Sequence, residues 1–367
     1  MQYNIFNLKI ISISADSSSC FSSVTFEPKM TGFRSIFLLS FLGFCLVSNG
    51  SDYSNEQSTA ILIEVDQFGN GDYRKIQDAI DAVNSNNSEH VFILIKPGIY
   101  REKIVVPEDK PFITFSGTTN ASKTIITWSD SGEILKSPTF SVLGSDFMAR
   151  YLTIQNEYGS GAKAVALRVS GDRVAFISCR ILCHQDTLLD DRGRHYYSNC
   201  YIEGDTDFIC GNAASFFQKC HLHSLARGTG AITAQRRQSQ AEETGFTFVN
   251  CKITGLKSAV LGRLGRPWGA YSRVVFAFTF MSNVILPQGW DNWGNFSKQR
   301  TAYYGEYKCY GLGARVSKRV NWSRNLSSQE AEPYLTEEFI GGTTWIRSAP
   351  SHFRRIAGAV HHHVNGS

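Results

Sequence analysis

The sequence predicts an all-β protein, a parallel β-helix in which short strands wind into stacked coils. Three observations lead to this prediction: similar segments recur about every twenty residues, apolar and polar residues alternate within each segment, and no long helical pattern separates them. Self-similarity at this period is typical of a solenoid. Alternation with period two makes each segment a strand with one face inside the coil.

The repeat is clearest in four segments that carry a cysteine at the same place. They are residues 175–182, 195–204, 215–224 and 246–255, with Cys179, Cys200, Cys220 and Cys251. Residues 146–156 form a fifth copy, with Arg150 in the cysteine position. Equivalent residues of a solenoid stack along its axis, so we expect these cysteines to be buried fillers rather than disulfides. The longer interval before Cys251 predicts a loop at residues 236–245.

Two elements are expected before the repeats. Residues 73–83 form an amphipathic helix whose apolar face carries Ile76, Ala79, Ile80 and Val83. A short helix of this kind can cap the open N-terminal end of a solenoid. Residues 91–106 predict a strand, a turn at Pro97-Gly98 and a second strand.

The N-terminal region carries a candidate targeting signal. Arg34 is followed by an apolar run of twelve residues, 36–47, which is too short to span a bilayer and has the length of a signal-peptide core. We therefore expect residues 1–29 to be an upstream extension and 30–50 a signal peptide; the alternative is a buried core segment. Acceptors of the N-x-S/T type agree with a secreted glycoprotein and stand at Asn86, Asn120, Asn295, Asn321, Asn325 and Asn365.

The rest of the chain is expected to be one domain, residues 58–350, and a tail, 351–367. The three histidines at 361–363 are interpreted as part of a solvated tail, and without a C-x-x-C pair a zinc site is not expected. The net charge of +5 mildly favours anionic partners such as acidic polysaccharide. No dense Lys/Arg run argues for nucleic acid, and we expect a monomer without membrane association.

Two aspartates are the candidate catalytic residues. Asp186 and Asp207 each lie seven residues after a repeat cysteine, so they should occupy the same place in successive coils. Neighbouring strands are about 4.7–4.9 Å apart, which predicts stacked carboxylates about 5 Å apart. Two like charges this close raise one pKa and make an acid and a nucleophile from one residue type. A structural aspartate ladder is the alternative, but the apolar neighbours Leu188 and Phe208 are poor hosts for idle charges.

Further residues fit a binding cleft. Gln185 can donate an amide hydrogen bond beside Asp186, and "LGRPWG" places Arg266 two residues before Trp268. Arginine binds carboxylates bidentately and tryptophan stacks on sugar rings; a surface salt bridge is the alternative for Arg266. The other acids of residues 183–211 are expected to be loop or solvated charges: Asp190, Asp191, Glu203 and Asp205.

Seven motifs follow one another between about residue 63 and residue 350. They are "GIYREK" (98–103), "AVALRVSGDR" (164–173), "HQDTL" (184–188), "YIEGDTDFICGNA" (201–213), "ITAQ" (232–235), "LGRPW" (264–268) and "YYGEY" (303–307). In order and spacing they resemble the plant pectinesterase (pectin methylesterase) family, in the form without the inhibitor-like pro-domain. The resemblance implies a right-handed parallel β-helix and a secreted aspartyl esterase that removes methyl esters from cell-wall pectin.

The resemblance also implies roles for individual residues. Asp207 would be the nucleophile, and Asp186 would protonate the departing methanol and then activate water. Gln185 would stabilise the oxyanion. The residues that would orient the nucleophile or line sugar subsites are Arg266, Trp268 and Phe208. No metal or other cofactor is implied; methylated homogalacturonan is the implied substrate and a proteinaceous pectinesterase inhibitor a further partner.

Two departures from the family pattern bear on activity. Lys163 stands where members often have a second oxyanion-stabilising glutamine. Its ammonium could stabilise an oxyanion as a point charge and would lower the pKa of Asp186, unless it points to solvent. Residues 261–263 duplicate the Leu-Gly-Arg of 264–266, an insertion that could loop out or displace Arg266.

Three functions therefore remain open from the sequence. The first is methyl ester hydrolysis. The second is another β-helix pectin enzyme, either a lyase, which needs a calcium site of carboxylates, or a polygalacturonase, which needs acids placed for glycosidic cleavage. The third is a pectin-binding protein that has lost catalysis through Lys163 or the insertion.

Overall fold

The structure is a computed structural model that describes residues 59–226, 228, 230–256, 262–348 and 350–355. The described residues belong to one compact unit, residues 55–367. The expected upstream extension, the expected signal peptide and the histidines at 361–363 lie outside the described residues. Within the described ranges, no helix is long and apolar enough to cross a membrane.

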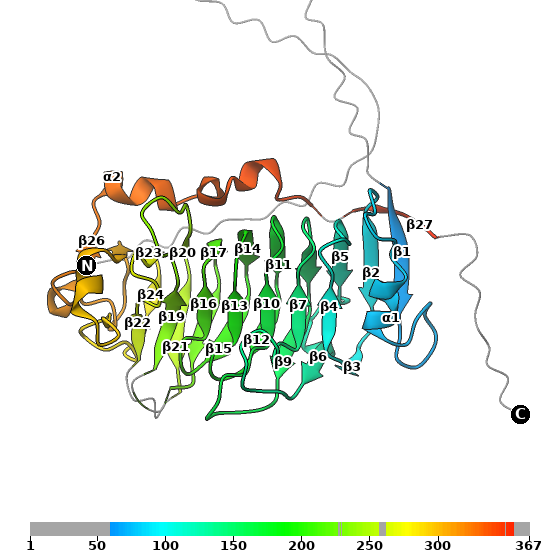
Figure 1. Ribbon diagram of the computed structural model, residues 1–367, viewed down its shortest axis with the longest axis horizontal. Coiled ribbons are helices and arrows are strands. Elements are labelled where there is room, and N and C mark those ends of the chain that lie inside the picture. Colours follow the sequence, from blue (N-terminus) through cyan, green and yellow to red (C-terminus); the bar gives the residue numbers. More distant parts are fainter. Residues whose placement is uncertain (1–58, 227, 229, 257–261, 349, 356–367) are drawn as a thin grey trace, which may run out of the picture. The chain divides into compact units, whose positions relative to one another are not determined.

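The described strands form three parallel sheets, and a complete coil in the middle of the solenoid contributes one strand to each sheet (Figure 1). Sheet A contains β1 (Thr59–Val65), β2 (Val91–Ile95), β5 (Ile113–Ser116), β8 (Met148–Arg150), β11 (Val174–Ile177), β14 (Arg194–Ser198), β17 (Ala214–Gln218), β20 (Gly245–Val249), β23 (Arg273–Ala277), β25 (Tyr303–Tyr307), β26 (Arg324–Asn325) and β27 (His352–Arg354). Sheet B contains β3 (Gly98–Arg101), β6 (Thr124–Trp128), β9 (Thr153–Asn156), β12 (Arg180–Leu182), β15 (Tyr201–Gly204), β18 (His221–Ser224), β21 (Lys252–Gly255) and β24 (Phe280–Met281). Sheet C contains β4 (Ile104–Val106), β7 (Phe140–Val142), β10 (Leu167–Val169), β13 (Leu188–Asp190), β16 (Ile209–Gly211), β19 (Ala231–Gln235) and β22 (Arg263–Gly265). The predicted parallel β-helix is confirmed.

The repeat cysteines line the inner corner between sheet A and sheet B. Cys179, Cys200, Cys220 and Cys251 are free and buried, as expected. The assignment of Arg150 to the same position is wrong. Arg150 pairs with Ile177 in sheet A, and Thr153 pairs with Arg180 in sheet B, so Leu152 takes the cysteine position. Left-handed turn residues confirm this register, because Tyr151 (φ 59°) stands directly before Leu152 as Ser178 (φ 54°) stands directly before Cys179.

A column of aromatic rings fills the interior next to these cysteines. Phe176, Tyr197, Phe217, Phe248 and Phe276 come from successive strands of sheet A. Successive ring centroids lie 4.5–5.5 Å apart with nearly parallel planes. Stacked aromatic pairs contribute about 0.5–1.5 kcal/mol each beyond the area that they bury. The column fixes the register of the coils and therefore of the residues at their corners.

The N-terminal helix is shorter than residues 73–83, and α1 spans Ile76–Asp81. Ile76, Ala79 and Ile80 are buried, as the apolar face predicted. The Glu102 carboxylate accepts hydrogen bonds from the backbone N–H groups of Ile76 and Gln77. This is a favourable place for a negative charge, because the N-terminal turn of a helix exposes unpaired N–H groups. The helix lies beside β1 at the N-terminal end of the solenoid (Figure 1).

The C-terminal part of the domain runs back along sheet A (Figure 1). Its helical turns are α2 (Ser328–Ala331), η4 (Glu332–Tyr334), η5 (Glu337–Ile340) and η6 (Gly342–Thr344); shorter turns elsewhere are η1 (Ala121–Lys123), η2 (Phe296–Arg300) and η3 (Val316–Lys318). Ile340 and Trp345 pack with Phe216 of β17 in one apolar cluster. β27 then pairs with β1, and the expected loop at 236–245 separates β19 from β20.

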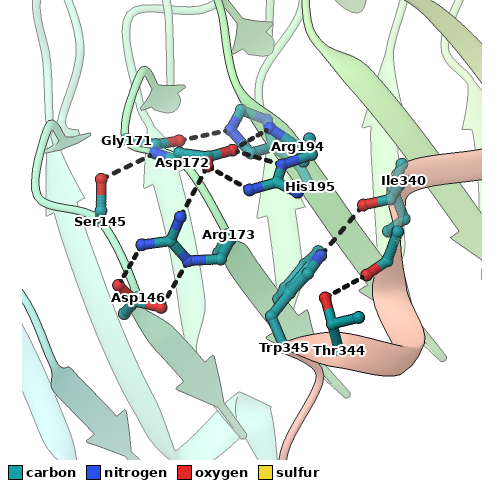
Figure 2. Close-up of polar contacts among 11 residues, drawn as sticks. Ser145, Asp146, Gly171, Asp172, Arg173, Arg194, His195, Ile340, Thr344 and Trp345 are labelled. Carbon is teal, nitrogen blue, oxygen red and sulfur yellow. Dashed lines mark hydrogen bonds and ion pairs between the residues drawn. The ribbon is translucent and has the colours of Figure 1, made fainter.

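Ion pairs connect successive coils beneath this C-terminal segment (Figure 2). Arg173 binds Asp146 of the previous coil bidentately, at 2.8 and 2.6 Å. Arg194 binds Asp172 in the same way, at 2.9 and 2.6 Å. Bidentate Arg–carboxylate pairs are the strong and geometrically specific form of this contact, so they reinforce the stacking of three consecutive coils.

Candidate active site

Asp186 and Asp207 lie at the corner where each coil passes from sheet B to sheet C. Isolated parallel bridges pair Lys163 with Gln185 and Gln185 with Thr206. The backbone N–H of Asp186 donates to the Thr206 carbonyl at 3.1 Å. The register therefore confirms that the two aspartates occupy the same place in successive coils, because each follows a residue of the bridged pair.

Both aspartates have a left-handed backbone, with φ of 61° for Asp186 and 49° for Asp207. Asp is one of the few residues other than glycine that adopt this conformation readily. Such positions nevertheless cost about 1–3 kcal/mol each and concentrate at functional sites. The conformation interrupts the strand alternation at this corner and so sets the direction of each carboxylate independently of the sheet pleat.

Arg266 fixes the second carboxylate. Its Nε and Nη2 donate to the two Asp207 carboxylate oxygens at 2.8 and 2.6 Å. The backbone of Arg266 is held in turn, since its N–H donates to the Thr233 carbonyl at 3.0 Å. Arg263, the equivalent residue of the duplicated Leu-Gly-Arg, pairs with Asp291 instead. Leu261 lies outside the described residues. The duplication does not displace Arg266, which keeps its hydrogen bonds to Asp207.

The two carboxyl groups differ in their tendency to ionise. Burial and the neighbouring Asp207 charge raise the pKa of Asp186 to about 7, although Lys163 and Arg266 oppose the rise. Burial also raises the pKa of Asp207, but the bidentate Arg266 acts directly against it. Near neutral pH the site can therefore hold a proton on Asp186 and a negative charge on Asp207. This difference is compatible with the predicted roles of acid and nucleophile, which stay predictions.

The family model of pectinesterases matches residues 62–343. The chain belongs to the pectinesterase family. It is 58% identical over 306 residues to putative pectinesterase 11 of Arabidopsis thaliana, covering 83% of this chain and 86% of the relative. A pectin methylesterase from carrot has the same fold with a TM-score of 0.75 and 36% identity, covering 78% of this chain and 95% of the carrot chain. A pectin methylesterase solved with a hexasaccharide matches with a TM-score of 0.66 and 25% identity, covering 80% and 98%. The lyase and polygalacturonase alternatives are not favoured.

We call the corner that holds Asp186 and Asp207 the catalytic corner, after the role predicted for these residues. The groove beside it runs over the outer face of sheet C. It is lined by Ile134, Leu135, Leu189, Asp191, Arg192, Asn212, Arg236 and Trp268. Trp268 is half-buried, and the Arg236 guanidinium lies 5.0 Å from its ring centroid. The cleft therefore combines apolar surface with cationic groups.

Phe208 is not part of that surface. It is fully buried in the interior cluster, although the sequence placed it in a sugar subsite. The left-handed turn directs Asp207 outward, and the next side chain returns into the coil. The proposed contact between Phe208 and substrate is therefore contradicted. Lys163 is exposed and Gln185 half-buried, and their backbones are bridged in register.

Trp293 is a site residue that the sequence did not reveal. The Arg266 guanidinium carbon lies 4.0 Å from its ring centroid, within cation–π range. Lys298 lies 5.8 Å from the same ring and donates to the carbonyls of Pro267 and Trp268. The only sequence signal was a second tryptophan in "WDNWG", a stretch outside the repeat.

Three of the four acids expected to be loop or solvated charges have defined partners. Asp205 contacts His184 at 3.1 Å, directly before Gln185 and Thr206. Asp191 pairs with Arg168 at 3.1 Å. The Glu203 carboxylate accepts the Tyr201 hydroxyl at 2.7 Å.

Asp190 departs furthest from its expected role as a loop or solvated charge, because it is fully buried inside the coil. Its carboxylate contacts His195 Nδ1 at 2.5 Å and accepts the Tyr197 hydroxyl at 2.7 Å. The Ser215 hydroxyl donates to its other oxygen. The expectation of a solvated charge is therefore wrong, because Asp190 lies in β13 two residues after the interior Leu188 and faces the same way.

Proposed function

We propose that this pectinesterase removes methyl esters from galacturonate units of pectin through a covalent intermediate on Asp207. The observation that carries the proposal is the Asp207 carboxylate, which accepts hydrogen bonds from Nε and Nη2 of Arg266 next to Asp186, whose pKa is about 7. The guanidinium aims one carboxylate as a nucleophile, and the neighbouring carboxyl group keeps a transferable proton.

In the first half of the reaction, an Asp207 oxygen attacks the ester carbonyl carbon. The electron pair of the carbonyl moves to its oxygen, and the Gln185 amide with the Lys163 ammonium would stabilise that oxyanion. As the carbonyl re-forms, the bond to the methoxy oxygen breaks, and Asp186 gives its proton to that oxygen. Methanol leaves, and Asp207 is joined to the galacturonate as an acid anhydride.

In the second half, Asp186 is a carboxylate and takes a proton from water. The hydroxide oxygen attacks the galacturonate carbonyl of the anhydride, and Asp207 departs as a carboxylate. The free galacturonate remains in the polymer, while Asp186 has regained its proton. Trp268 would stack on the sugar chain in the groove, and Trp293 would hold Arg266 against Asp207.

We also propose that the protein is secreted to the cell wall as a monomeric glycoprotein. Five of the six N-x-S/T acceptor asparagines are among the described residues, and all five are exposed, as glycosylation requires. N-terminal sequencing of the secreted protein should find a start after residue 50. A start before residue 30 would contradict the expected signal peptide.

The decisive assay is methanol release from methylated pectin. Wild type should release methanol without unsaturated products or chain shortening, whereas Asp207→Ala should lose at least about a thousandfold in kcat, since the nucleophile is gone. Asp109→Ala, at an exposed aspartate far along the chain, is the matched control and should keep wild-type activity. Pectin binding by wild type without methanol would favour the binding-protein alternative.

A further inference from the structure

A single row of side chains crosses the outer face of sheet B, one from each of six successive coils. Backbone pairing places them in register, in the order Arg180, Tyr201, His221, Lys252, Phe280 and Tyr310. We call this set the sheet B row. Lys252 and Tyr310 are exposed and the other four are half-buried, on strands that follow one another along the solenoid (Figure 1).

Cations and aromatic rings are mixed along the sheet B row. The Arg180 guanidinium lies 5.4 Å from the Tyr201 ring centroid, and the His221 ring meets Tyr201 edge-on at 5.1 Å. Phe280 and Tyr310 lie 5.6 Å apart. Burial and the nearby Lys252 ammonium keep the pKa of His221 below its usual range. The row therefore contains two contacting groups, and Lys252 lies between them in register.

The row has the chemistry to recognise a linear acidic polysaccharide. Arg and Lys bind carboxylates, and aromatic faces pack on sugar rings. Five strands and the bridged Tyr310, at about 4.8 Å spacing, extend over about 24 Å, a length suited to a rod-like chain of several sugars. Glu203, the acid next to the row, accepts the Tyr201 hydroxyl and keeps its negative charge, but the two cations Arg180 and Lys252 outweigh it.

The sheet B row is separate from the catalytic corner. Arg180 precedes Asp186 by six residues, and Tyr201 precedes Asp207 by six. Arg180 and Tyr201 begin β12 and β15, whereas Asp186 and Asp207 lie beyond the ends of these strands. The row and the carboxylates therefore lie at opposite ends of the sheet B strands, and the row would be a second site.

We propose that the sheet B row binds a stretch of de-esterified homogalacturonan, a linear polymer of galacturonate with free carboxylates. The nature of this occupant rests on the proposed function, because the row would hold the polymeric product of the reaction. A polymer held at the row raises the effective concentration of its remaining methylated stretches at the catalytic corner. Methylated stretches lack the charge and would bind the row more weakly.

The test is the affinity of the protein for fully de-esterified polygalacturonate, measured by biolayer interferometry at low and at physiological salt. Lys252→Glu should weaken binding about tenfold, since it removes one attraction and adds one repulsion. Tyr310→Ala should weaken it about threefold. Lys75→Glu changes the net charge equally at an exposed residue beside α1 and should weaken binding less than twofold.

Two results would contradict the proposal that the sheet B row binds this polymer. One is equal weakening by Lys252→Glu and Lys75→Glu, which would mean that only net charge matters. The other is wild-type binding by Lys252→Glu and Tyr310→Ala. Methanol release from a short methylated oligogalacturonate separates this proposal from the reaction. All three variants should keep wild-type turnover of that substrate, and loss of turnover in Lys252→Glu would place the residue in the catalytic cleft. If wild type released no methanol but the variants showed the expected binding pattern, the proposed reaction would be contradicted and the proposed binding site would be supported.

Discussion

Asp186 and Asp190 are two buried carboxyl groups four residues apart in one coil, and their surroundings are opposite. Asp190 faces the interior and contacts His195, Tyr197 and Ser215. Asp186 faces the catalytic corner, where another carboxylate, Asp207, is its neighbour. The buried charge of Asp190 is therefore compensated by its partners. The charge of Asp186, the acid proposed for catalysis, is instead opposed by a like-charged neighbour.

The difference shows how one fold serves both purposes. His195 contacts Asp190 through Nδ1 and the Gly171 carbonyl through Nε2, so both ring nitrogens can donate and the imidazolium form is favoured. Burial alone would lower the pKa of His195, but the Asp190 charge and hydrogen bonds raise it. At Asp186 burial and like charge act in the same direction and raise the carboxyl pKa. A carboxyl group in this state disfavours the folded protein whenever it is ionised.

The largest effect on stability is expected from Asp190→Asn. The substitution keeps the shape but leaves the His195 charge in a dry interior without its counter-ion. Breaking a buried ion pair on one side costs about 3–5 kcal/mol. Urea unfolding near pH 6 should show this loss, and a change below about 1 kcal/mol would mean that the cluster does not hold an ion pair.

The dependence of this stability on pH has a definite sign. The folded pKa of His195 lies above its ordinary value. The stability contributed by the pair is therefore fully present below the unfolded pKa, about 6.5, and is lost as pH rises through the folded value. The wild-type advantage over Asp190→Asn should shrink accordingly at high pH.

Asp186→Asn should have the opposite sign. The folded pKa of about 7 lies above the ordinary 3.8, so this group lowers stability as pH rises through that interval. Removing the charge should raise the free energy of unfolding by about 2–4 kcal/mol at pH 8, with a smaller gain at pH 5. Activity should be lost at the same time. Destabilisation at pH 8 would show that Asp186 is satisfied as an anion, like a structural residue.

The sequence could predict the coil and the meeting of Asp186 with Asp207 because both follow from the repeat period alone. Residues equivalent in the repeat must stack, whatever their side chains do. Contacts that depend on the direction of a side chain could not be predicted in this way. Phe208 points inward because the left-handed turn at Asp207 interrupts the alternation, and Asp190 points inward because it follows the interior Leu188 by two residues in β13. Trp293 comes from a loop outside the repeat, where no period relates it to Arg266.

Arg266→Lys tests how far the aim of Asp207 matters beyond its charge. Lysine keeps the positive charge but cannot reproduce two parallel N–H bonds. We expect kcat to fall about 10–100-fold with little change in KM. Arg263→Lys is the matched control, because this arginine occupies the same place in the duplicated Leu-Gly-Arg and contacts Asp291. A larger loss for Arg263→Lys than for Arg266→Lys would reverse the assignment.

The smallest expected effects are shifts in the pH dependence of kcat/KM. Removing the Lys163 charge and removing the Asp205 charge should shift it in opposite directions. Lys163 lowers the pKa values of both Asp186 and Asp207, whereas Asp205 raises them. In kcat/KM, the alkaline limb reports loss of the Asp186 proton and the acidic limb reports ionisation of Asp207. Lys163→Gln should therefore move both limbs to higher pH, and Asp205→Asn should move both to lower pH, each by less than about one unit.

The double variant makes this test sharper. Lys163→Gln with Asp205→Asn removes one charge of each sign, so its profile should return close to that of wild type. Glu203→Gln removes a carboxylate two residues from Asp205 that is bonded to Tyr201, and serves as the control for a change of net charge alone. An unchanged profile in Lys163→Gln would mean that the ammonium points to solvent and plays no part in the site. Shifts in the same direction from both single variants would mean that they act by disturbing the corner rather than through their charges.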